Sequence, residues 1–284
     1  MGAYGTRGGK VAFYNLRRGN LIGQSTGGRR IIKSIAVSPD GNWGACGNDD
    51  GNVVIFDLSG ATVRALACAE RLDDDITGLG FSTDSRTLFV LAQDGTLARF
   101  NVSSQTKAGA QPTGISKPNV MAVDPTGTFV AVGGNDGEIQ VFDARSLVAK
   151  RPKPITLTND GLVSAISFSQ DGKYLAAASE SDGVGMWETA RLTDKPVVQY
   201  KGLDEWAKGV GFSADGRRVC GFDSEKRFVV WDRASGTENK RHEFEAFKTA
   251  KRFEPRCGFI GPDGTVLMGT ADGEFIHFTV KSAN

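Results

Sequence analysis

The chain has 284 residues, 39% of them hydrophobic and 24% charged, with 37 glycines and a formal net charge of +1 at pH 7. This composition is typical of a turn-rich globular β-protein, and it excludes a disordered chain and a coiled coil. The nearly neutral charge predicts no general attraction to nucleic acid or to a membrane surface, so any such attraction has to come from a local patch.

The N-terminal residues and the cysteines give no indication of export. The segment Met1–Arg7 lacks the apolar core of a signal peptide, and no stretch reaches the roughly 18 continuous apolar residues of a membrane span. The cysteines Cys46, Cys68, Cys220 and Cys257 are far apart and lack metal-type spacing. We expect them to be small buried hydrophobic residues in a reducing compartment, which predicts a cytoplasmic or nuclear protein.

The predicted elements are short strands from one end of the chain to the other. The first segment, 1–24, predicts strands near 3–6, 10–14 and 21–24. The segment 32–66 predicts four, because its β-rich runs are separated by turns that contain Gly, Asp or Asn. Similar segments follow, and no helical period separates the runs, so the fold class is all-β. We expect a single domain over 1–284, with later segments at 76–111, 118–157, 163–200, 207–247 and 255–281.

Two marks recur with one period and a constant phase, which indicates a repeat architecture. An aromatic residue followed by a polar residue, or by a charged one, ends a β-rich run at intervals of 42 to 47 residues. These pairs are Tyr14-Asn15, Phe56-Asp57, Phe100-Asn101, Phe142-Asp143, Trp187-Glu188, Trp231-Asp232 and Phe278-Thr279. A corner centred on Asp-Gly or an equivalent precedes each of the last six pairs. The corners are Ser38–Gly41, Ser82–Ser85, Asp124–Gly127, Ser169–Gly172, Ser213–Gly216 and Gly261–Gly264.

These residues resemble the repeats of the WD40 family, as in the blade-closing Trp231-Asp232 and the Ser-Pro-Asp-Gly corner at 38–41. The resemblance implies a β-propeller, in which four-stranded sheets close into a ring. We expect seven blades, with the N-/C-terminal blade incomplete. The repeats are divergent, because the family's Gly-His pair is missing and only His242 and His277 are present. Fold resemblance by itself implies no activity.

The two ends of the chain do not complement each other as blade parts. The N-terminal segment predicts the second, third and fourth strands of a blade, and the C-terminal segment 255–281 predicts the first, second and third. Three explanations remain open: a longer polypeptide supplies the missing strand, one blade is short, or a partner donates a strand by β-augmentation.

Candidate catalytic and cofactor sites are weak, and we predict no enzyme activity, no cofactor and no metal site. Two histidines in predicted strands offer little for a nucleophilic triad. The segment Gly5–Lys10 superficially resembles a phosphate loop but precedes no helix. The acidic runs Asp73–Asp75 and Asn48–Asn52 do not have the spacing of a calcium loop, and Asp50-Gly51 recurs elsewhere as a turn.

The function that remains is a non-catalytic scaffold, which binds another protein or peptide in a multiprotein assembly. Loops that join the fourth strand of one blade to the first of the next, and the second strand to the third, are expected on one rim. Trp206 is the strongest candidate there, because tryptophan is enriched among interface residues that dominate binding energy. The other predicted partner-binding residues are Arg30, Asn48, Asp75, Gln93, Lys117, Asn135, Asp160 and Asp223.

Basic segments offer an alternative function. The segment 240–252 interleaves basic and aromatic residues, and Lys248, Lys251 and Arg252 could hold RNA phosphates in a ribonucleoprotein. The same segment also fits an outer strand followed by a solvated loop. The pairs Arg17-Arg18 and Arg29-Arg30 weakly resemble the paired arginines of lipid-binding propellers, although basic turns are common without any ligand.

Overall fold

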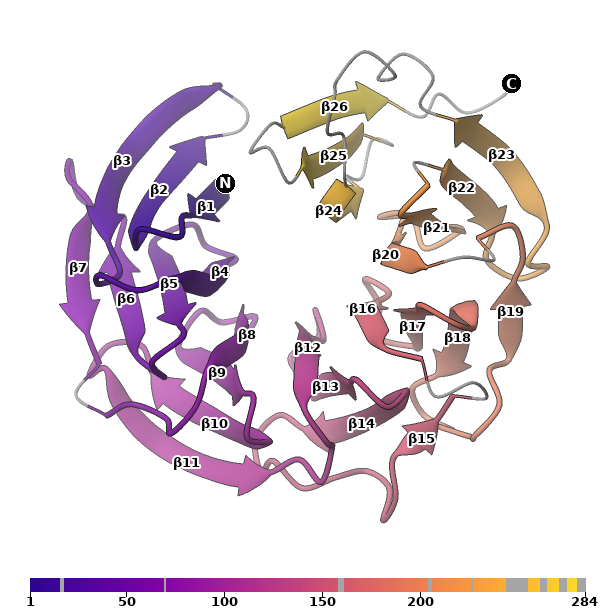
Figure 1. The fold of residues 1–284 in the computed structure, drawn as a ribbon, viewed down its shortest axis with the longest axis horizontal. Coiled ribbons are helices and arrows are strands. Elements are labelled where there is room, and N and C mark those ends of the chain that lie inside the picture. Colours follow the sequence, from indigo (N-terminus) through magenta and orange to yellow (C-terminus); the bar gives the residue numbers. More distant parts are fainter. Residues whose placement is uncertain are drawn as a thin grey trace. The chain divides into compact units, whose positions relative to one another are not determined.

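A computed structural model describes residues 1–15, 18–68, 70–157, 161–203, 206–225, 227–243, 255–260, 265–270 and 275–279, with side chains described as far as residue 238. In these residues, 26 strands form seven antiparallel sheets of three or four strands, and no helix is present (Figure 1). The all-β prediction is therefore confirmed.

The contacts divide the chain into two compact units. Unit 1 comprises Met1–Val123, Gly127–Val132 and Val141–Pro152, and unit 2 comprises Asp124–Thr126, Gly133–Gln140 and Lys153–Asn284. The sheet β12-β13-β14-β15 contains residues of both. Its strands are β12 (Pro118–Val123), β13 (Phe129–Gly134), β14 (Glu138–Asp143) and β15 (Ile155–Thr156).

Three sheets lie wholly in unit 1, and their strands follow one another in chain order. They are β1 (Gly2–Gly5), β2 (Lys10–Asn15) and β3 (Asn20–Thr26); β4 (Ile32–Val37), β5 (Trp43–Asn48), β6 (Val53–Asp57) and β7 (Arg64–Ala67); and β8 (Ile76–Phe81), β9 (Thr87–Ala92), β10 (Thr96–Asn101) and β11 (Thr106–Pro112).

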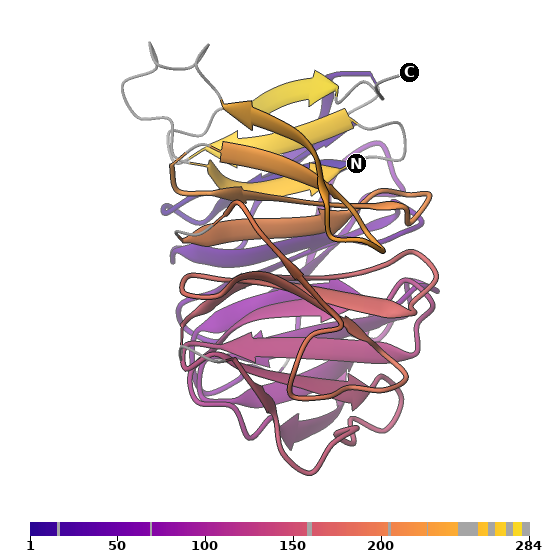
Figure 2. The same ribbon diagram turned by 90° about the vertical axis from the view of Figure 1, so that its right-hand side faces the viewer.

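Three further sheets lie in unit 2, and β16 packs against β20, so neighbouring sheets stack face to face (Figure 2). Their strands are β16 (Val163–Phe168), β17 (Tyr174–Ser179), β18 (Gly183–Glu188) and β19 (Val198–Tyr200); β20 (Ala207–Phe212), β21 (Arg218–Asp223), β22 (Arg227–Asp232) and β23 (Glu238–Glu243); and β24 (Pro255–Ile260), β25 (Thr265–Thr270) and β26 (Phe275–Thr279).

The register of the ladders identifies each strand's position in its sheet. The inner pairs β4–β5, β8–β9, β16–β17, β20–β21 and β24–β25 each contain a register shift that leaves one residue of the first strand unpaired. The middle pairs β5–β6, β17–β18 and β21–β22 have none. The pair β1–β2 is also regular, and the pair β2–β3 is shifted as β10–β11 is. The first sheet therefore holds strands two to four among the described residues.

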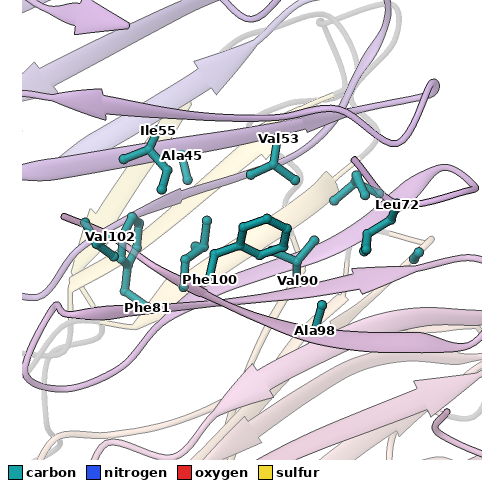
Figure 3. Packing of buried hydrophobic residues seen from close by; sticks show 12 residues of the cluster. Ala45, Val53, Ile55, Leu72, Phe81, Val90, Ala98, Phe100 and Val102 are labelled. Carbon is teal, nitrogen blue, oxygen red and sulfur yellow. The ribbon is translucent and has the colours of Figure 1, made fainter. Parts of the chain in front are cut away.

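Apolar side chains between stacked sheets form the cores. In unit 1, Phe100 and Val90 are fully buried against Ala45, Val53 and Ile55 of the preceding sheet (Figure 3). Burial of this kind is worth roughly 1.5–3 kcal/mol for each large side chain. The pair-forming aromatics Phe56, Phe100, Phe142, Trp187 and Trp231 are likewise buried.

The first sheet departs from this pattern of buried aromatics. Tyr14 is only partly buried and stacks on Tyr4, with ring centroids 5.8 Å apart, while the adjacent Phe13 is fully buried and contacts Phe56. The register shift between Phe13 and Tyr14 leaves Ile22 of β3 unpaired and does not explain this difference, because the same shift in β10–β11 leaves Phe100 buried. The predicted mark thus lies one residue away from the aromatic that fills the core.

The repeated corners are rigid turns. At four of them a serine hydroxyl donates to the aspartate two residues later, and the same serine oxygen accepts the N–H of the residue five positions on. These pairs are Ser38/Asp40, Ser82/Asp84, Ser169/Asp171 and Ser213/Asp215. The hydrogen bond from the serine is the main cause that lowers the pKa of Asp84, Asp171 and Asp215.

Candidate functional site

One repeated hydrogen bond organises the ends of the sheets opposite the corners. The carbonyl of the residue before the first strand accepts the N–H of the residue after the second strand, as in Asp75 with Gln93 and Trp206 with Ser224. The bond lengths are 2.9 and 3.2 Å, respectively. We use "loop rim" for these fourth-to-first and second-to-third strand loops within each unit. The bond fixes the two kinds of loop against each other.

Trp206 is the most exposed large aromatic residue on the described loop rim, with 55% of its surface accessible. Its N–H donates to the Glu180 carbonyl at 3.2 Å and its own carbonyl accepts from Ser224, also at 3.2 Å. The residue therefore bridges the β17–β18 turn and the β21–β22 turn. Its φ of 45° lies in the left-handed region, which is uncommon for a residue with a bulky side chain and marks a constrained position.

An ion pair between two largely buried side chains supports the Trp206 ring. Lys208 Nζ lies 4.7 Å from the ring centroid and 2.5 Å from Glu180 Oε1. The side chains of Lys208 and Glu180 are only 25% and 21% exposed. A cation over an indole face attracts it, and the carboxylate holds the cation in place. One ring face is thus covered, and the exposed remainder of the indole is left for a partner.

The bulge in β20 explains the position of Lys208. Lys208 is the unpaired residue of the β20–β21 ladder, between Ala207 and Gly209. Bulges turn a side chain away from the regular alternation of faces. The corresponding residues of three other first strands also reach neighbouring sheets. Lys33 forms an ion pair with Asp75. The hydroxyls of Thr77 and Ser164 donate to the carbonyls of Pro118 and Ala207, respectively.

The predicted partner-binding residues differ in how far their side chains are exposed. Trp206, Arg30, Gln93, Lys117 and Asn135 are exposed. Asp75 is half-buried and its carboxylate is 3.1 Å from Lys33 Nζ. Within unit 2, the hydrogen bond between Trp206 and Ser224 brings Trp206 and Asp223 together, and within unit 1 Arg30 and Asn48 line the same surface hollow.

Asp223 corrects the sequence prediction, because it is buried and its carboxylate serves its own turn; Asn48 is also buried, but only its carboxamide oxygen serves its turn. Asp223 accepts the Arg227 N–H at 2.9 Å and pairs with Arg227 Nε at 2.6 Å. Each is the last residue of its strand, whereas Gln93 and Asn135 come one residue after theirs. That offset of one residue exchanges an inward side chain for an outward one. Asp160, Lys248, Lys251 and Arg252 lie outside the described residues.

Sequence reasoning missed Glu180 and Lys208. The signal for Lys208 was the alignment of Lys33, Thr77, Ser164 and Lys208, since all four occupy the second position of a first strand. Glu180 follows a second strand, as Gln93 does, and could have been found by the same alignment. Neither position carries an unusual residue type, so composition alone does not reveal the pair.

The described residues offer little for metal or thiol chemistry. Among them, no three His, Cys, Asp or Glu side chains come together in a way that could hold a metal ion. Burial raises the pKa of the Cys46 thiol to about 12 and that of Cys68 to about 11. Burial also raises the pKa of Cys220. A search of the described part of the chain for a helix long and apolar enough to cross a bilayer finds none.

The stacked antiparallel sheets and their loop rims define a protein of the β-propeller class. The crystal structure of the computationally designed Ika8 protein is similar, with a TM-score of 0.75, 19% sequence identity, and coverage of 98% of this chain and 80% of that one. The family description "WD domain, G-beta repeat" matches residues 19–57, 112–143 and 153–188. Three WD40 repeats of this chain are thus matched, and the resemblance seen in its repeats is confirmed.

Curated relatives share this repeat at low identity. The probable U3 small nucleolar RNA-associated protein 18 of Schizosaccharomyces pombe is 26% identical over 58% of this chain and 31% of that protein. The human U3 small nucleolar RNA-associated protein 4 homolog is 23% identical over 87% of this chain and 36% of that protein. The Protein LST8 homolog of Drosophila melanogaster is 22% identical over 70% and 64%. The chain spans about a third of the length of the first two relatives.

Proposed function

We propose that the chain is a non-catalytic scaffold that binds another protein or a peptide through its loop rim, within a multiprotein assembly. One observation carries this proposal: the exposed Trp206, held at both its N–H and its carbonyl by adjacent turns and supported by Lys208. An aromatic side chain that is already fixed loses little conformational freedom on binding.

The test is an affinity purification of the full chain from cell extract, with mass spectrometry of the proteins that are retained. We expect at least one stoichiometric partner in mild salt. Trp206→Ala should weaken its binding by about thirtyfold or more, since an interface tryptophan that dominates binding contributes 2 kcal/mol or more. Val197→Ala is the matched control, because Val197 is 50% exposed in the same unit. A partner retained equally by both variants contradicts the proposal.

A donated strand is one proposed way for a partner to bind unit 1. Among the described residues, β1 pairs only with β2, through a regular ladder like those of the middle pairs β5–β6 and β17–β18. An unpaired strand edge can accept an added strand through main-chain hydrogen bonds. Hydrogen exchange should then slow at the β1 amides when the partner is added. Unchanged exchange at Gly2–Gly5 in a saturated complex refutes this mode of binding.

The second candidate function is RNA association in the nucleus. Three relatives have names that associate them with U3 small nucleolar RNA. They come from Schizosaccharomyces pombe, human and Saccharomyces cerevisiae. In this chain, Lys248, Lys251 and Arg252 would contact phosphates. RNA binding should fall steeply with salt, and replacing all three by Gln should weaken it and lower the salt slope by about 2, whereas replacing all three by Glu should abolish it. RNA binding that is unaffected by salt and by these substitutions refutes this candidate.

A further inference from the structure

A hollow of about 500 Å³ opens on the loop rim of unit 1, between its first two sheets. Its walls come from the β3–β4 loop and the β5–β6 turn, and its floor comes from β6 and β7. None of the exposed loop-rim residues in unit 2 takes part in it. The hollow is therefore a separate site from the one centred on Trp206.

Side-chain size explains why the two sheets separate here. Near the start of the hollow, a Cβ added to Gly23 of β3 would lie 2.6 Å from Val63 Cγ2, so the sheets touch. Further along, Ala65 and Ala67 of β7 are the facing residues, and their small side chains leave the space between the sheets open. Val54 and Cys68 complete an apolar floor.

An amide donor of a buried residue points into this space. Asn48 is 2% exposed, and its carboxamide oxygen accepts the N–H groups of Asp50 and Asn52, each at 3.0 Å. These bonds turn its Nδ2 toward Gly28, where an added Cβ would lie 3.6 Å from Nδ2. Nδ2 has no hydrogen-bond partner in the described part of the chain. Although Asn48 as a residue is buried, Nδ2 is not one of the buried unpaired polar atoms among the described residues, so it faces the open hollow and is accessible to a ligand.

A positive charge lies at the mouth of the hollow. Arg29 is exposed and makes no ion pair with any described residue. The neighbouring Arg30 is neutralised by Asp50, whose Oδ2 lies 2.7 Å from Arg30 Nε. The hollow thus combines one available guanidinium, one available amide N–H and an apolar floor.

We propose that the hollow binds an extended peptide segment in which a carboxylate side chain lies next to a small apolar side chain. The carboxylate accepts from Arg29 and from Asn48 Nδ2, and the apolar side chain packs on Val54, Ala65 and Ala67. Charge-assisted bonds of this kind are the strong ones. A phosphate group fits less well, because its larger charge would face Asp50 with only one uncommitted arginine nearby.

The test uses the full chain labelled with ¹⁵N and three probes. The first is the peptide acetyl-Gly-Val-Glu-Gly-amide, the second is its Gln counterpart, and the third is inorganic phosphate. We expect the Glu peptide to shift the amide signals of Gly28, Asn48 and Asp50 in a saturable way. The Gln peptide should bind about tenfold more weakly, because it loses one charge-assisted hydrogen bond.

Three variants complete the design. Arg29→Gln should reduce the affinity for the Glu peptide to that for the Gln peptide, while Arg86→Gln, at the corner end of the same unit, should leave it unchanged. Ala67→Leu should fill the floor and abolish binding of both peptides. Trp206→Ala should have no effect on this titration, so failure here is distinct from failure of the proposed scaffold function.

Several results would overturn the proposal. Equal affinity for the Glu and Gln peptides would show that no carboxylate is recognised. Phosphate that saturates the same signals as tightly as the Glu peptide would show a simple anion site. Absence of any saturable shift at Gly28 and Asn48 with the unmodified chain would show that the hollow binds no such peptide.

Discussion

The pair formed by Asp223 and Arg227 allows a quantitative test of how the loop rim is held. The Asp223 carboxylate is 0% exposed, and it accepts one backbone and one guanidinium N–H from Arg227, whose side chain is 22% exposed. A neutral hydrogen bond contributes about 1 kcal/mol and one to a charged group about 1.5–3 kcal/mol. Asp223→Ala removes both bonds and should therefore cost about 2.5–4 kcal/mol of unfolding free energy.

The order of three variants tests the reasoning more strictly than any one value. Asp223→Asn keeps an acceptor for the backbone N–H and should cost about 1–2 kcal/mol. Arg227→Gln leaves a carboxylate without its cation in a fully buried position, so it should cost the most, about 3–5 kcal/mol. Urea unfolding with equal m-values measures these differences. If Arg227→Gln costs less than Asp223→Asn, the carboxylate is not desolvated as the structure indicates.

Three further predictions concern the core, the corners and the Trp206 support. Phe100→Ala should lower the unfolding free energy by about 3–5 kcal/mol, whereas the exposed Val148→Ala should change it little in the same urea assay. Stability should fall as pH decreases from about 5 to 3, because the folded-state pKa of Asp171 is lowered and the unfolded chain therefore binds more protons at this residue. Ser169→Ala should flatten this pH dependence, because it removes the hydrogen bond that lowers the pKa. Lys208→Met should change Trp206 fluorescence while Lys173→Met does not, and identical spectra would refute the contact.

The repeat made most of the fold predictable from sequence. The paired aromatics and the Asp-Gly corners mark the ends of strands directly, since both depend on local turn geometry and on burial of one large side chain per repeat. The three strands expected before residue 24 are present as β1, β2 and β3. Because such local signals recur along the chain, one irregular copy does not change the predicted fold.

The candidate site was harder to predict because it depends on single-residue offsets. Asn48 and Gln93 both stand near the end of a second strand, yet one is buried and the other exposed. Tyr14 matches the repeat, but the fully buried aromatic of its strand is the adjacent Phe13. The hollow beside Ala67 arises from the separation of two sheets, which no property of one strand's sequence expresses.

The unpaired residue in each first strand has a consequence for how such a chain can diversify. Its side chain joins neighbouring sheets through an ion pair at Lys33 and Lys208 and through a hydroxyl at Thr77 and Ser164. The backbone geometry is the same in each case, so the chemistry of a junction can change by one codon without disturbing the ladder. Successive repeats can thereby differ in how strongly salt and force affect the junctions between their sheets, while they retain a common architecture.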